Sequence, residues 1–431
     1  MDPHSGGRLA AVGKFLVFVF AFSAFCVSSC TDSGRQSASL GADGGKGGAG
    51  GEKSFEARGG AEPEFELRFR ALEGLGSDSA TDFAFVPGRL EVLQLTRGGD
   101  LLHLKLEQDS RELLTHWPFQ EEMLLEDACV PTNILFDRDF PDRPFIYVTY
   151  CPDAQTNRLV RYQWDENNGP TKPAVIFELS TESSPELWHR FGAMGWESDE
   201  VLWLLAGDHN LMAAAQDASH PAGALLRLLP SRTPGQQGYQ GAPGNLVDLA
   251  GSASGVHPAI YAFGFRSPWR GTRDRWGNFW VGDAGSDFFE EINRVTHAGQ
   301  NFGWPLHEGP CTSSCGSMVE PVAFYGLGEE ERYLRDDPSV SDFEQRAVWV
   351  GEAYSSSAQR PDRYQGLLTD VVVFGDLFSG VVRGLGVEKA GLQSDQALGH
   401  LPWVVAWREG PDGFVYVLDL YGKWYRAELA N

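Results

Sequence analysis

The residues with the clearest capacity for chemistry lie between Tyr261 and Gly309. Within this stretch Arg266 follows an apolar run and stands two positions before Pro268, which disfavours helix and ends the run. We therefore expect Arg266 at the end of a strand, facing a cleft. A guanidinium there could hold a planar, oxygen-bearing group by two parallel hydrogen bonds. The alternative is an ordinary ion pair at the surface.

A cluster of acidic residues follows a few positions later. The strand expected at 279–282 leads directly into Asp283, and Asp287, Glu290 and Glu291 come soon after it. Gathered carboxylates repel one another unless a cation joins them. Calcium takes about 6–8 oxygen ligands, and these include backbone carbonyls of the kind that glycine turns expose. A calcium site and a solvated acidic loop are both compatible with this pattern.

Three motifs of this stretch resemble those of a known family. They are GFRSPWR, GDAGSDFFEEIN and GQNFGWP, and their spacing is compatible with the family pattern. The family is that of the glucose/sorbosone dehydrogenases, six-bladed propellers that use pyrroloquinoline quinone (PQQ), and the resemblance is closest to the branch with the Hedgehog-interacting proteins. Weaker similarity runs from about Phe65 to the end of the chain.

The elements that must position these residues are strands. A unit of strand, Gly/Asp turn and strand recurs six times after residue 64, and 42% hydrophobic residues allow a sizeable core. The six units are PGRLEVLQLTRGGDLLHLKL, DRPFIYVTYC with RLVRYQW, DEVLWLLAGDHN with GALLRLL, RWGNFWVGDAG with EEINRV, LTDVVVFGDLFSGVVRGLGV, and PDGFVYVLDLYGKWYRAEL. The pattern predicts an all-β, six-bladed propeller of four-stranded antiparallel blades over residues 64–431. A pair of β-sandwiches is the alternative.

The resemblance also implies which residues act in catalysis. The family's catalytic histidine begins a unit that ends in Gly-Asp, and HRFGAMGWESDEVLWLLAGD aligns with that unit without a gap. His189 is therefore the candidate base for an aldose hydroxyl, and Arg266 is the candidate positive group for the quinone oxygens of PQQ. The alternative for His189 is a polar position at the rim beside Trp188.

The resemblance places the metal directly after the Gly-Asp strand. It implies Asp283, Ala284 and Gly285 as local calcium ligands, with Glu291 in support. The other Gly-Asp pairs, which end at Asp208 and Asp376, are interpreted as turns in which the aspartate caps its own backbone.

Two departures concern the cofactor. Ser267 stands where the family has an asparagine, and Trp403 and Val405 stand where sugar dehydrogenases carry the two arginines that hold the PQQ carboxylates. Burying those carboxylates without cations is costly. Trp403 could stack on a planar ring or could be a core aromatic. The candidate replacements for the missing cations are Arg383, Arg408 and Lys423.

The N-terminus is typical of an exported protein. Arg8 and Lys14 precede an apolar run at 15–25, and the sequence VSSC that ends at Cys30 resembles a bacterial lipobox. We expect a signal peptide over 1–29, lipidation of Cys30, and a Gly/Ser-rich disordered tether over 30–63, which together imply an outer-membrane lipoprotein. An uncleaved anchor and a plain secretory peptide are the alternatives.

The four cysteines that follow Cys30 form an even set, which suits disulfides in an oxidising compartment. We expect Cys129 to pair with Cys151 and Cys311 with Cys315. Zinc is the poorer interpretation, because an exported protein favours disulfides.

The formal charge of −24 argues against nucleic acid as a partner. Three functions stay open. The first is oxidation of an aldose with PQQ and calcium, with electrons passing to an acceptor. The second is a non-catalytic propeller of the Hedgehog-interacting type, which binds carbohydrate or protein and has lost the cofactor clamp. The third is a calcium-dependent lactone or ester hydrolase.

Overall fold

The structure is a computed structural model that describes residues 65–430, except 75–78, 120–122, 126–128, 182–187, 198–199, 252–254, 312–314, 327–345, 356–359 and 389–390. The expected signal peptide (1–29), the lipidated Cys30 and the tether (30–63) lie outside the described residues and stay predictions. In the described part of the chain, no helix combines the length and the hydropathy needed to cross a bilayer.

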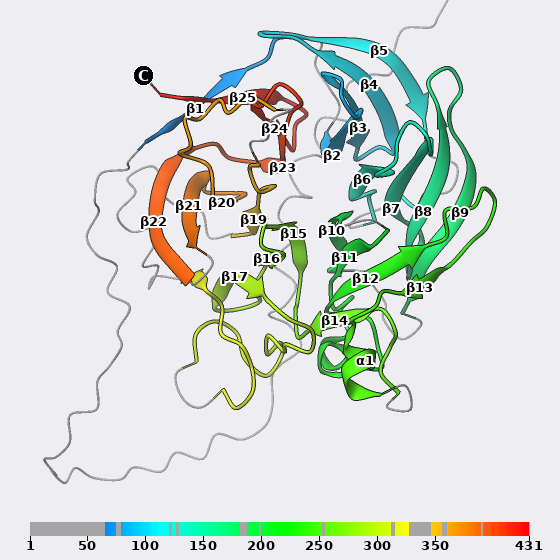
Figure 1. The fold of residues 1–431 in the computed structure, drawn as a ribbon, viewed down its shortest axis with the longest axis vertical. Helices are drawn as coiled ribbons and strands as arrows, with labels where there is room; N and C mark the ends of the chain where they lie inside the picture. Colours follow the sequence, from blue (N-terminus) through cyan, green and yellow to red (C-terminus); the bar gives the residue numbers. More distant parts are fainter. Residues whose placement is uncertain are drawn as a thin grey trace, which may run out of the picture. The chain divides into compact units, whose positions relative to one another are not determined.

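Six antiparallel sheets are arranged around a central axis (Figure 1). Blades 1 to 3 contain β2 (Ala80–Phe85), β3 (Glu91–Thr96), β4 (Asp100–Leu106) and β5 (Arg111–Pro118), then β6 (Asn133–Phe136), β7 (Phe145–Asp153), β8 (Thr156–Asp165) and β9 (Gly169–Ser180), then β10 (Phe191–Trp196), β11 (Leu202–Ala206), β12 (Ala224–Pro230), β13 (Tyr239–Gly241) and β14 (Ile260–Phe263). The connections in blade 3 carry a 3₁₀-helix, η2 (Met212–Gln216), and the short helix α1 (Leu246–Ala250).

Blades 4 to 6 complete the ring. They contain β15 (Pro268–Arg273), β16 (Phe279–Asp283), β17 (Phe289–Val295) and β18 (Ala323–Gly326), then β19 (Val348–Val350), β20 (Val371–Asp376), β21 (Val381–Glu388) and β22 (Gly391–His400), then β23 (Val404–Glu409), β24 (Val415–Asp419), β25 (Trp424–Leu429) and β1 (Leu67–Ala71).

The predicted six-bladed propeller is confirmed, and each of the six sequence units supplies the two middle strands of one blade. Five sheets have the expected four strands. The sheet of blade 3 has a fifth strand, because β14 also pairs with β12.

Blade 6 joins the two ends of the propeller. Its outer strand is β1, which pairs with β25 in the register Leu67 to Leu429 and Ala71 to Tyr425. The ring is therefore closed by hydrogen bonds between segments more than 350 residues apart.

Burial explains why the middle strands are so apolar. All five residues of β11, LWLLA, are buried, since neighbouring sheets cover both of its faces. The outer strand β5 has one face open and is mostly exposed. The second strand of a blade thus reads as a continuous apolar run rather than an alternating one.

The first strand of each blade lies nearest the axis, because β2, β6, β10, β15 and β19 contact one another in turn and β23 contacts β2. Arg270 of β15 reaches across this centre. It donates from Nε to the Val405 carbonyl at 2.6 Å, from Nη1 to Asn133 Oδ1 at 2.8 Å and from Nη2 to the Thr81 carbonyl at 2.7 Å. One buried side chain therefore links blades 4, 6, 2 and 1.

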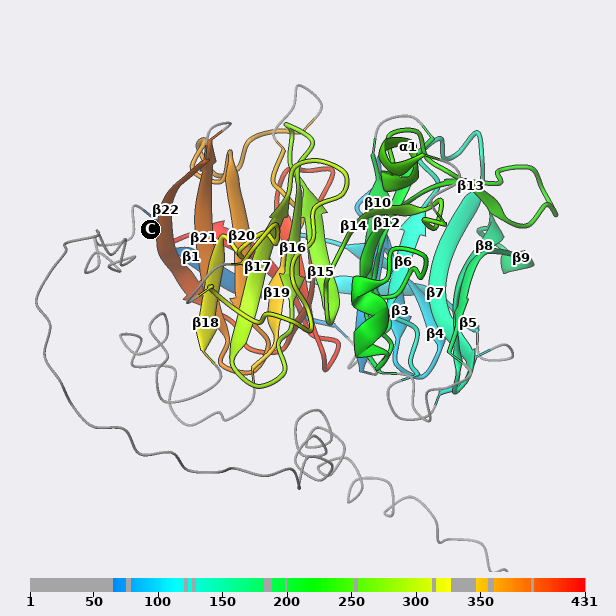
Figure 2. The ribbon, with the colours of Figure 1, turned by 90° about the horizontal axis from the view of Figure 1, so that it is seen from below.

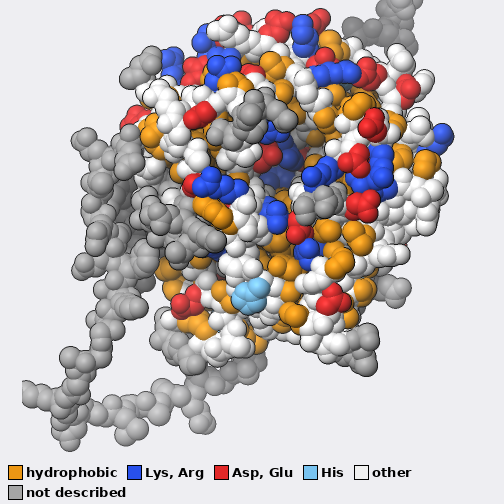
Figure 3. Space-filling model, viewed as in Figure 1, with side chains coloured by type: hydrophobic (Ala, Val, Ile, Leu, Met, Phe, Trp, Pro, Cys, Tyr) orange, Lys and Arg blue, Asp and Glu red, His pale blue; other side chains and the backbone are white. Residues whose placement is uncertain are grey.

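A second arginine reaches the axis from blade 6. Both carboxylate oxygens of Asp82 accept hydrogen bonds from Arg408 Nη2, at 3.0 and 2.9 Å, and Asp82 also accepts the N–H of Ile134. A space-filling view along the axis shows a hollow in the middle of the ring with Lys and Arg side chains in it (Figure 3). Charged side chains thus line the central hollow.

His189, Arg266 and Trp403 occupy comparable places in three blades. Each lies one or two residues before the innermost strand of its sheet, namely β10, β15 and β23. All three therefore lie at the same end of the ring, among the connecting loops that Figure 2 shows along its edges. The fold brings toward one mouth residues that are up to 214 positions apart.

Candidate active site

His189 and Asp208 form a buried pair. His189 Nδ1 lies 2.6 Å from Asp208 Oδ1, and the Asp208 carboxylate is fully buried. The hairpin register explains the pairing, because Phe191 opposes Ala206, so the residues just beyond these two positions meet. Gly207 is required there, since a Cβ at this position would lie 1.9 Å from the His189 carbonyl oxygen.

The charges of this pair can be assigned. Burial favours the neutral acid of Asp208, but His189, the Asn210 N–H and the Trp304 indole outweigh it and hold the pKa of Asp208 below its usual value. An ionised carboxylate only accepts hydrogen bonds, so Nδ1 of His189 carries the proton. Burial and the charge of Arg266 lower the pKa of His189, against the opposing effect of Asp208. Nε2 therefore offers a lone pair at neutral pH.

Trp304 connects this pair to Arg266. Its indole Nε1 donates to Asp208 Oδ2 at 2.8 Å, and the guanidinium of Arg266 lies 5.4 Å from the centre of its ring. The backbone carbonyl oxygen of Arg266 also accepts the N–H of Asp208 at 2.8 Å. The expected base and the expected positive group thus lie on adjacent blades within one network.

Asp283 holds the start of β15. Its Oδ2 accepts the N–H of Arg266 at 2.9 Å and its Oδ1 accepts the N–H of Ser267 at 2.6 Å. Ser267 therefore enters this network through its backbone. Burial and the nearby charge of Glu291 raise the pKa of Asp283 well above its usual value, because two carboxylates share one water-poor region.

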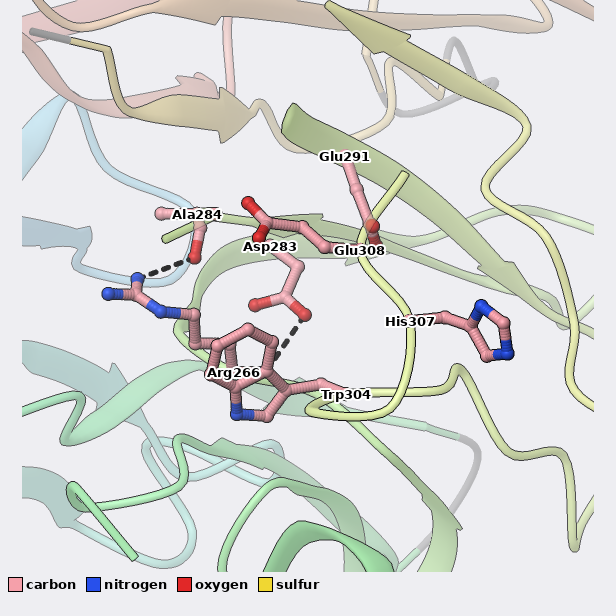
Figure 4. A pocket seen from close by; sticks show the side chains of 8 residues that line it. Arg266, Asp283, Ala284, Glu291, Trp304, His307 and Glu308 are labelled. Carbon is pink, nitrogen blue, oxygen red and sulfur yellow. Dashed lines mark hydrogen bonds between the residues drawn. The ribbon is translucent and has the colours of Figure 1, made fainter. Parts of the chain in front are cut away.

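Asp283 and Glu291 line the same cavity of about 10 Å³ (Figure 4). The other lining residues are Arg266, Ala284, Gly285, Trp304, His307 and Glu308. Figure 4 shows Asp283 between Arg266 and Glu291, whereas the ring of His307 points away. A space of this size holds about one water molecule or one small ion.

The acidic run divides between two faces of β17. Glu291 points into the cavity, where burial raises its pKa to about 7 and its oxygens accept hydrogen bonds from Asn293 and Gly309. Glu290 points the other way and accepts the N–H of Val348 in blade 5 at 2.8 Å. Strand alternation therefore removes Glu290 from this cavity.

Glu308 pins the loop that carries the candidate ligands. One oxygen of this side chain, Oε1, accepts four consecutive backbone N–H groups, those of residues 286, 287, 288 and 289, at 2.8 to 3.1 Å. The loop also depends on Gly285, where a Cβ would lie 1.8 Å from the Phe289 carbonyl oxygen. The carbonyl of Ala284 accepts a hydrogen bond from Arg266 Nη1 at 2.9 Å.

Trp403 lies at the same end of the ring but in another group of side chains. Its ring packs edge-on against Phe378 and Tyr421, with ring centres 5.5 and 5.6 Å away. Val405 lies two positions later and is buried, and its carbonyl oxygen accepts the hydrogen bond from Arg270 Nε. The structure thus brings together His189, Arg266, Ser267, Asp283, Ala284, Gly285 and Glu291, but not Trp403.

The structure also locates the cations considered as replacements for the missing arginines. Arg408 is committed to Asp82, and Arg383 pairs with Asp395 at 2.9 Å. Lys423 is exposed in the turn between β24 and β25. In the described residues, two of these three cations are therefore already engaged with carboxylates, Arg383 with Asp395 and Arg408 with Asp82.

Two other arginines, Arg190 and Arg97, lie within electrostatic range of each other. Arg190 follows His189 and donates from Nη1 to the Val130 carbonyl at 2.7 Å, and Arg97 lies in the turn between β3 and β4. Burial, and then the charge of Arg190, lowers the pKa of Arg97. Within the described part of the chain neither guanidinium has a carboxylate in salt-bridge range.

The cysteines behave differently in the two expected pairs. Cys311 and Cys315 are joined by a disulfide. Cys129 and Cys151 are buried in contact with each other as thiols, so the predicted bond is not formed in this structure although the partners are adjacent. That bond stays a prediction for oxidising conditions.

Comparison with known proteins identifies the family. The family model for glucose / sorbosone dehydrogenase matches residues 78–322. The chain belongs to the glucose/sorbosone dehydrogenase family. The aldose sugar dehydrogenase YliI of Escherichia coli K12 is 25% identical over 351 residues, which cover 78% of this chain and 85% of YliI.

Two further family comparisons bear on the fold and the branch. The PQQ-bound aldose sugar dehydrogenase of Streptomyces coelicolor superposes with a TM-score of 0.63 at 15% identity, over 85% of this chain and all of that one, which shows a shared fold. The HIPL2 protein of Arabidopsis thaliana is 33% identical over 190 residues, which cover 38% of this chain and only 26% of that protein. The family expected from the motifs is confirmed.

Two residues of the site were missed in the sequence. Asp208 was interpreted as a turn cap, and it does accept the N–H of Asn210 at 2.9 Å, but its main partner is His189. Asp376 in blade 5 does behave as a cap, since Oδ1 accepts the N–H groups of Phe378 and Ser379. The missing signal was the hairpin register, which places residue 208 opposite residue 189. Nothing in the local sequence marks Trp304 as its partner.

Proposed function

We propose that this chain oxidises an aldose sugar at C1, using PQQ and calcium, and passes the electrons to an external acceptor. The observation that carries the proposal is the pair of His189 and Asp208 beside Arg266. A neutral imidazole oriented by a buried carboxylate is a general base, and a guanidinium nearby stabilises developing negative charge. Membership of the glucose/sorbosone dehydrogenase family supports the same chemistry.

His189 handles the proton. Nε2 accepts the proton of the C1 hydroxyl as the hydride leaves C1, and the ring becomes an imidazolium whose Nδ1–H stays bonded to Asp208. The ionised Asp208 stabilises that positive charge and fixes the tautomer. PQQ, when bound, supplies the quinone that accepts the hydride.

Arg266 provides the positive charge for the quinone oxygens. Its guanidinium is restrained by Trp304 on one side and by the Ala284 carbonyl on the other, so it is already oriented before a ligand enters. Preorganised charge of this kind loses little entropy on binding.

The donors around the small cavity suit one hard cation. Buried carboxylates with raised pKa values are stabilised by a cation between them, and Asp283 and Glu291 meet that condition. We assign the calcium ion to Asp283, Glu291 and the carbonyls of Ala284 and Gly285, all of which border the small cavity.

The residues present also offer partners for the PQQ carboxylates, although these differ from the family's clamp. Trp403 and Val405 occupy the clamp positions. Arg190 directly follows His189 in the sequence, and its charge contributes to the lowered pKa of Arg97, so these two guanidiniums lie within electrostatic range of each other. We assign Arg97 and Arg190 to binding of the PQQ carboxylates.

In an Arg97→Gln variant the affinity for PQQ should fall about tenfold or more, since hydrogen bonds to charged groups contribute about 1.5–3 kcal/mol. An unchanged affinity, measured by the absorbance of bound PQQ, would remove Arg97 from this role.

Reconstitution tests the proposal as a whole. The purified chain is mixed with PQQ and calcium, the absorption spectrum of the bound quinone is recorded, and a panel of aldoses is offered with a dye acceptor. We expect a spectral change and sugar-dependent dye reduction. In a His189→Ala variant that retains its circular dichroism, the dye reduction should be lost while the spectral change of bound PQQ remains. If saturating PQQ causes no spectral change, the proposed PQQ-dependent oxidation of sugars is refuted.

The second candidate is a non-catalytic binding propeller. The observation in its favour is the replacement of the clamp by Trp403 and Val405, together with the commitment of Arg408 to Asp82. The reconstitution decides between the two, because a binding propeller would show sugar or protein affinity without any response to PQQ.

For its location we propose an outer-membrane lipoprotein anchored through Cys30 after removal of residues 1–29. The support is the lipobox-like sequence VSSC. In a Gram-negative host the protein should fractionate with the outer membrane, and Cys30→Ser should move it to the soluble or inner-membrane fraction. Unchanged fractionation of that variant would contradict the anchor.

A further inference from the structure

Three large apolar side chains project into water beside the candidate site. Met212, Phe288 and Leu306 are 54%, 64% and 63% exposed, and they are among only seven large hydrophobic residues exposed in the described residues. We call these three residues the apolar rim. Single exposed hydrophobics are ordinary, but a group of them beside a functional site marks a contact surface.

The loops that carry the apolar rim are joined to one another. Gln216, at the end of η2, donates to the Trp304 carbonyl at 2.7 Å and exchanges hydrogen bonds with Asn301. Glu308 in turn holds the N–H of Phe288 at 3.0 Å. The three side chains are therefore exposed on restrained loops rather than on loose ones.

The apolar rim also borders the site chemically. Met212 lies four positions after Asp208, and Leu306 lies between Trp304 and Glu308, both of which line the cavity beside Arg266. A molecule bound to the apolar rim would thus lie close to Arg266, beside which the proposed function places the quinone that accepts the electrons of the sugar.

Charge and shape select the kind of molecule. The chain carries −24, and Asp217 and Asp287 are exposed close to the rim, so a positively charged partner is favoured and an anionic lipid surface is repelled. Two of the three rim residues are aliphatic, whereas sugars stack on aromatic faces. A basic protein is the partner that fits best.

We propose that the apolar rim docks a small, positively charged electron-carrier protein. The proposal rests on the proposed function and specifies its acceptor. Each sugar oxidised leaves two electrons at the site, a one-electron carrier removes them in two encounters, and the two protons pass to solvent. A three-residue patch with acidic neighbours suits a weak, transient contact of the size seen in redox encounters.

The test compares two acceptors with the same PQQ- and calcium-loaded protein. The probe is a basic c-type cytochrome, followed by stopped-flow absorbance, and the reference is the small dye. The variants are Met212→Ser, Phe288→Ser and Leu306→Ser, singly and combined. The matched control is Leu113→Ser with Leu114→Ser, two residues exposed on the outer strand β5.

We expect the combined variant to lower the second-order rate with the cytochrome at least about fivefold, which corresponds to about 1 kcal/mol of contact energy. Dye reduction should not change, and the control should alter neither rate. Added salt should slow the cytochrome reaction of the unmodified protein, and a cytochrome with succinylated lysines should react more slowly.

The outcomes separate the two proposals. If the dye is reduced but the combined variant and the control react equally fast with the cytochrome, the docking surface is refuted and the proposed function stands. If the rim variants slow the dye as much as the cytochrome, the rim serves the sugar rather than a carrier, and the docking surface is again refuted. If not even the dye is reduced, the proposed function fails and the docking proposal fails with it.

Discussion

At the scale of single residues, the candidate site contains charged groups that are buried away from water, and Asp208 is the clearest example. Asp208 is fully buried yet ionised, because His189 and Trp304 each take one of its oxygens. Removing a partner from such a group leaves an uncompensated buried charge, which costs far more than the loss of an exposed hydrogen bond.

The pH dependence of turnover follows from His189. Burial and Arg266 lower its pKa below the ordinary 6.5, so the neutral base persists into mild acid and is lost only as pH falls through the lowered value. We expect the acid limb of kcat/KM to have its midpoint below pH 6.5. The profile is measured with the dye acceptor, with circular dichroism as a check that the fold survives. A midpoint above 6.5 would contradict this environment.

Asp208 should act through His189 rather than through the fold alone. In Asp208→Asn the amide no longer fixes the tautomer, so kcat should fall about 10²–10⁴-fold, the range of general acid–base catalysis, with little change in KM. Asp376→Asn is the matched control, because Asp376 caps the equivalent turn of blade 5. That variant should lower the melting temperature and leave kcat near normal. Equal losses of kcat in the two variants would reduce Asp208 to a turn cap.

At the scale of elements, the hairpin between the first and second strand is the unit that builds the site. In blade 3 it joins His189 to Asp208, and in blade 4 it joins Arg266 to Asp283. The same local geometry thus places a base in one blade and a cation beside a carboxylate in the next.

The loop after β16 gives a prediction at this scale. Glu308 holds four of its N–H groups, so Glu308→Ala should loosen the Ala284 and Gly285 carbonyls and weaken calcium binding about 10- to 100-fold, as loss of supporting contacts does in metal sites. Glu308→Gln keeps a carbonyl acceptor and should recover part of the affinity. Calorimetry with calcium alone measures it. Equal affinity of the alanine variant and the unmodified protein would show that the loop holds its own shape.

The strands of the middle of each blade could be predicted from the sequence because burial on both sides makes them strongly apolar. The outer strand β5 could not, since its burial alternates only weakly. Likewise Asp283 was found from local acidity, whereas Trp304 reaches Asp208 across 96 residues and leaves no local pattern.

At the scale of the whole molecule, the ring has a charged centre. Arg270 donates to acceptors from three other blades, and burial lowers its pKa to about 10, so it stays protonated at neutral pH. Such a group replaces solvent as the hydrogen-bond partner of the innermost strands.

Arg270→Met should therefore destabilise the entire propeller. Three buried acceptors lose their donor, and at about 1 kcal/mol or more each the free energy of unfolding should fall by roughly 3 kcal/mol. Arg89→Met removes only surface ion pairs with Glu166 and Glu91 and should change stability by less than about 1 kcal/mol. Denaturant unfolding measures both. Similar values for the two variants would mean that the axis tolerates an apolar side chain.

The pairing of β1 with β25 has a consequence for biosynthesis. While the ribosome is still making residues 404–429, β1 has no partner and the final blade does not exist, so the nascent polypeptide stays an open arc. The ring can close only after β25 has left the ribosome and paired with β1. Any process that requires an unlocked polypeptide, such as threading through a narrow translocation pore, has that interval in which to act.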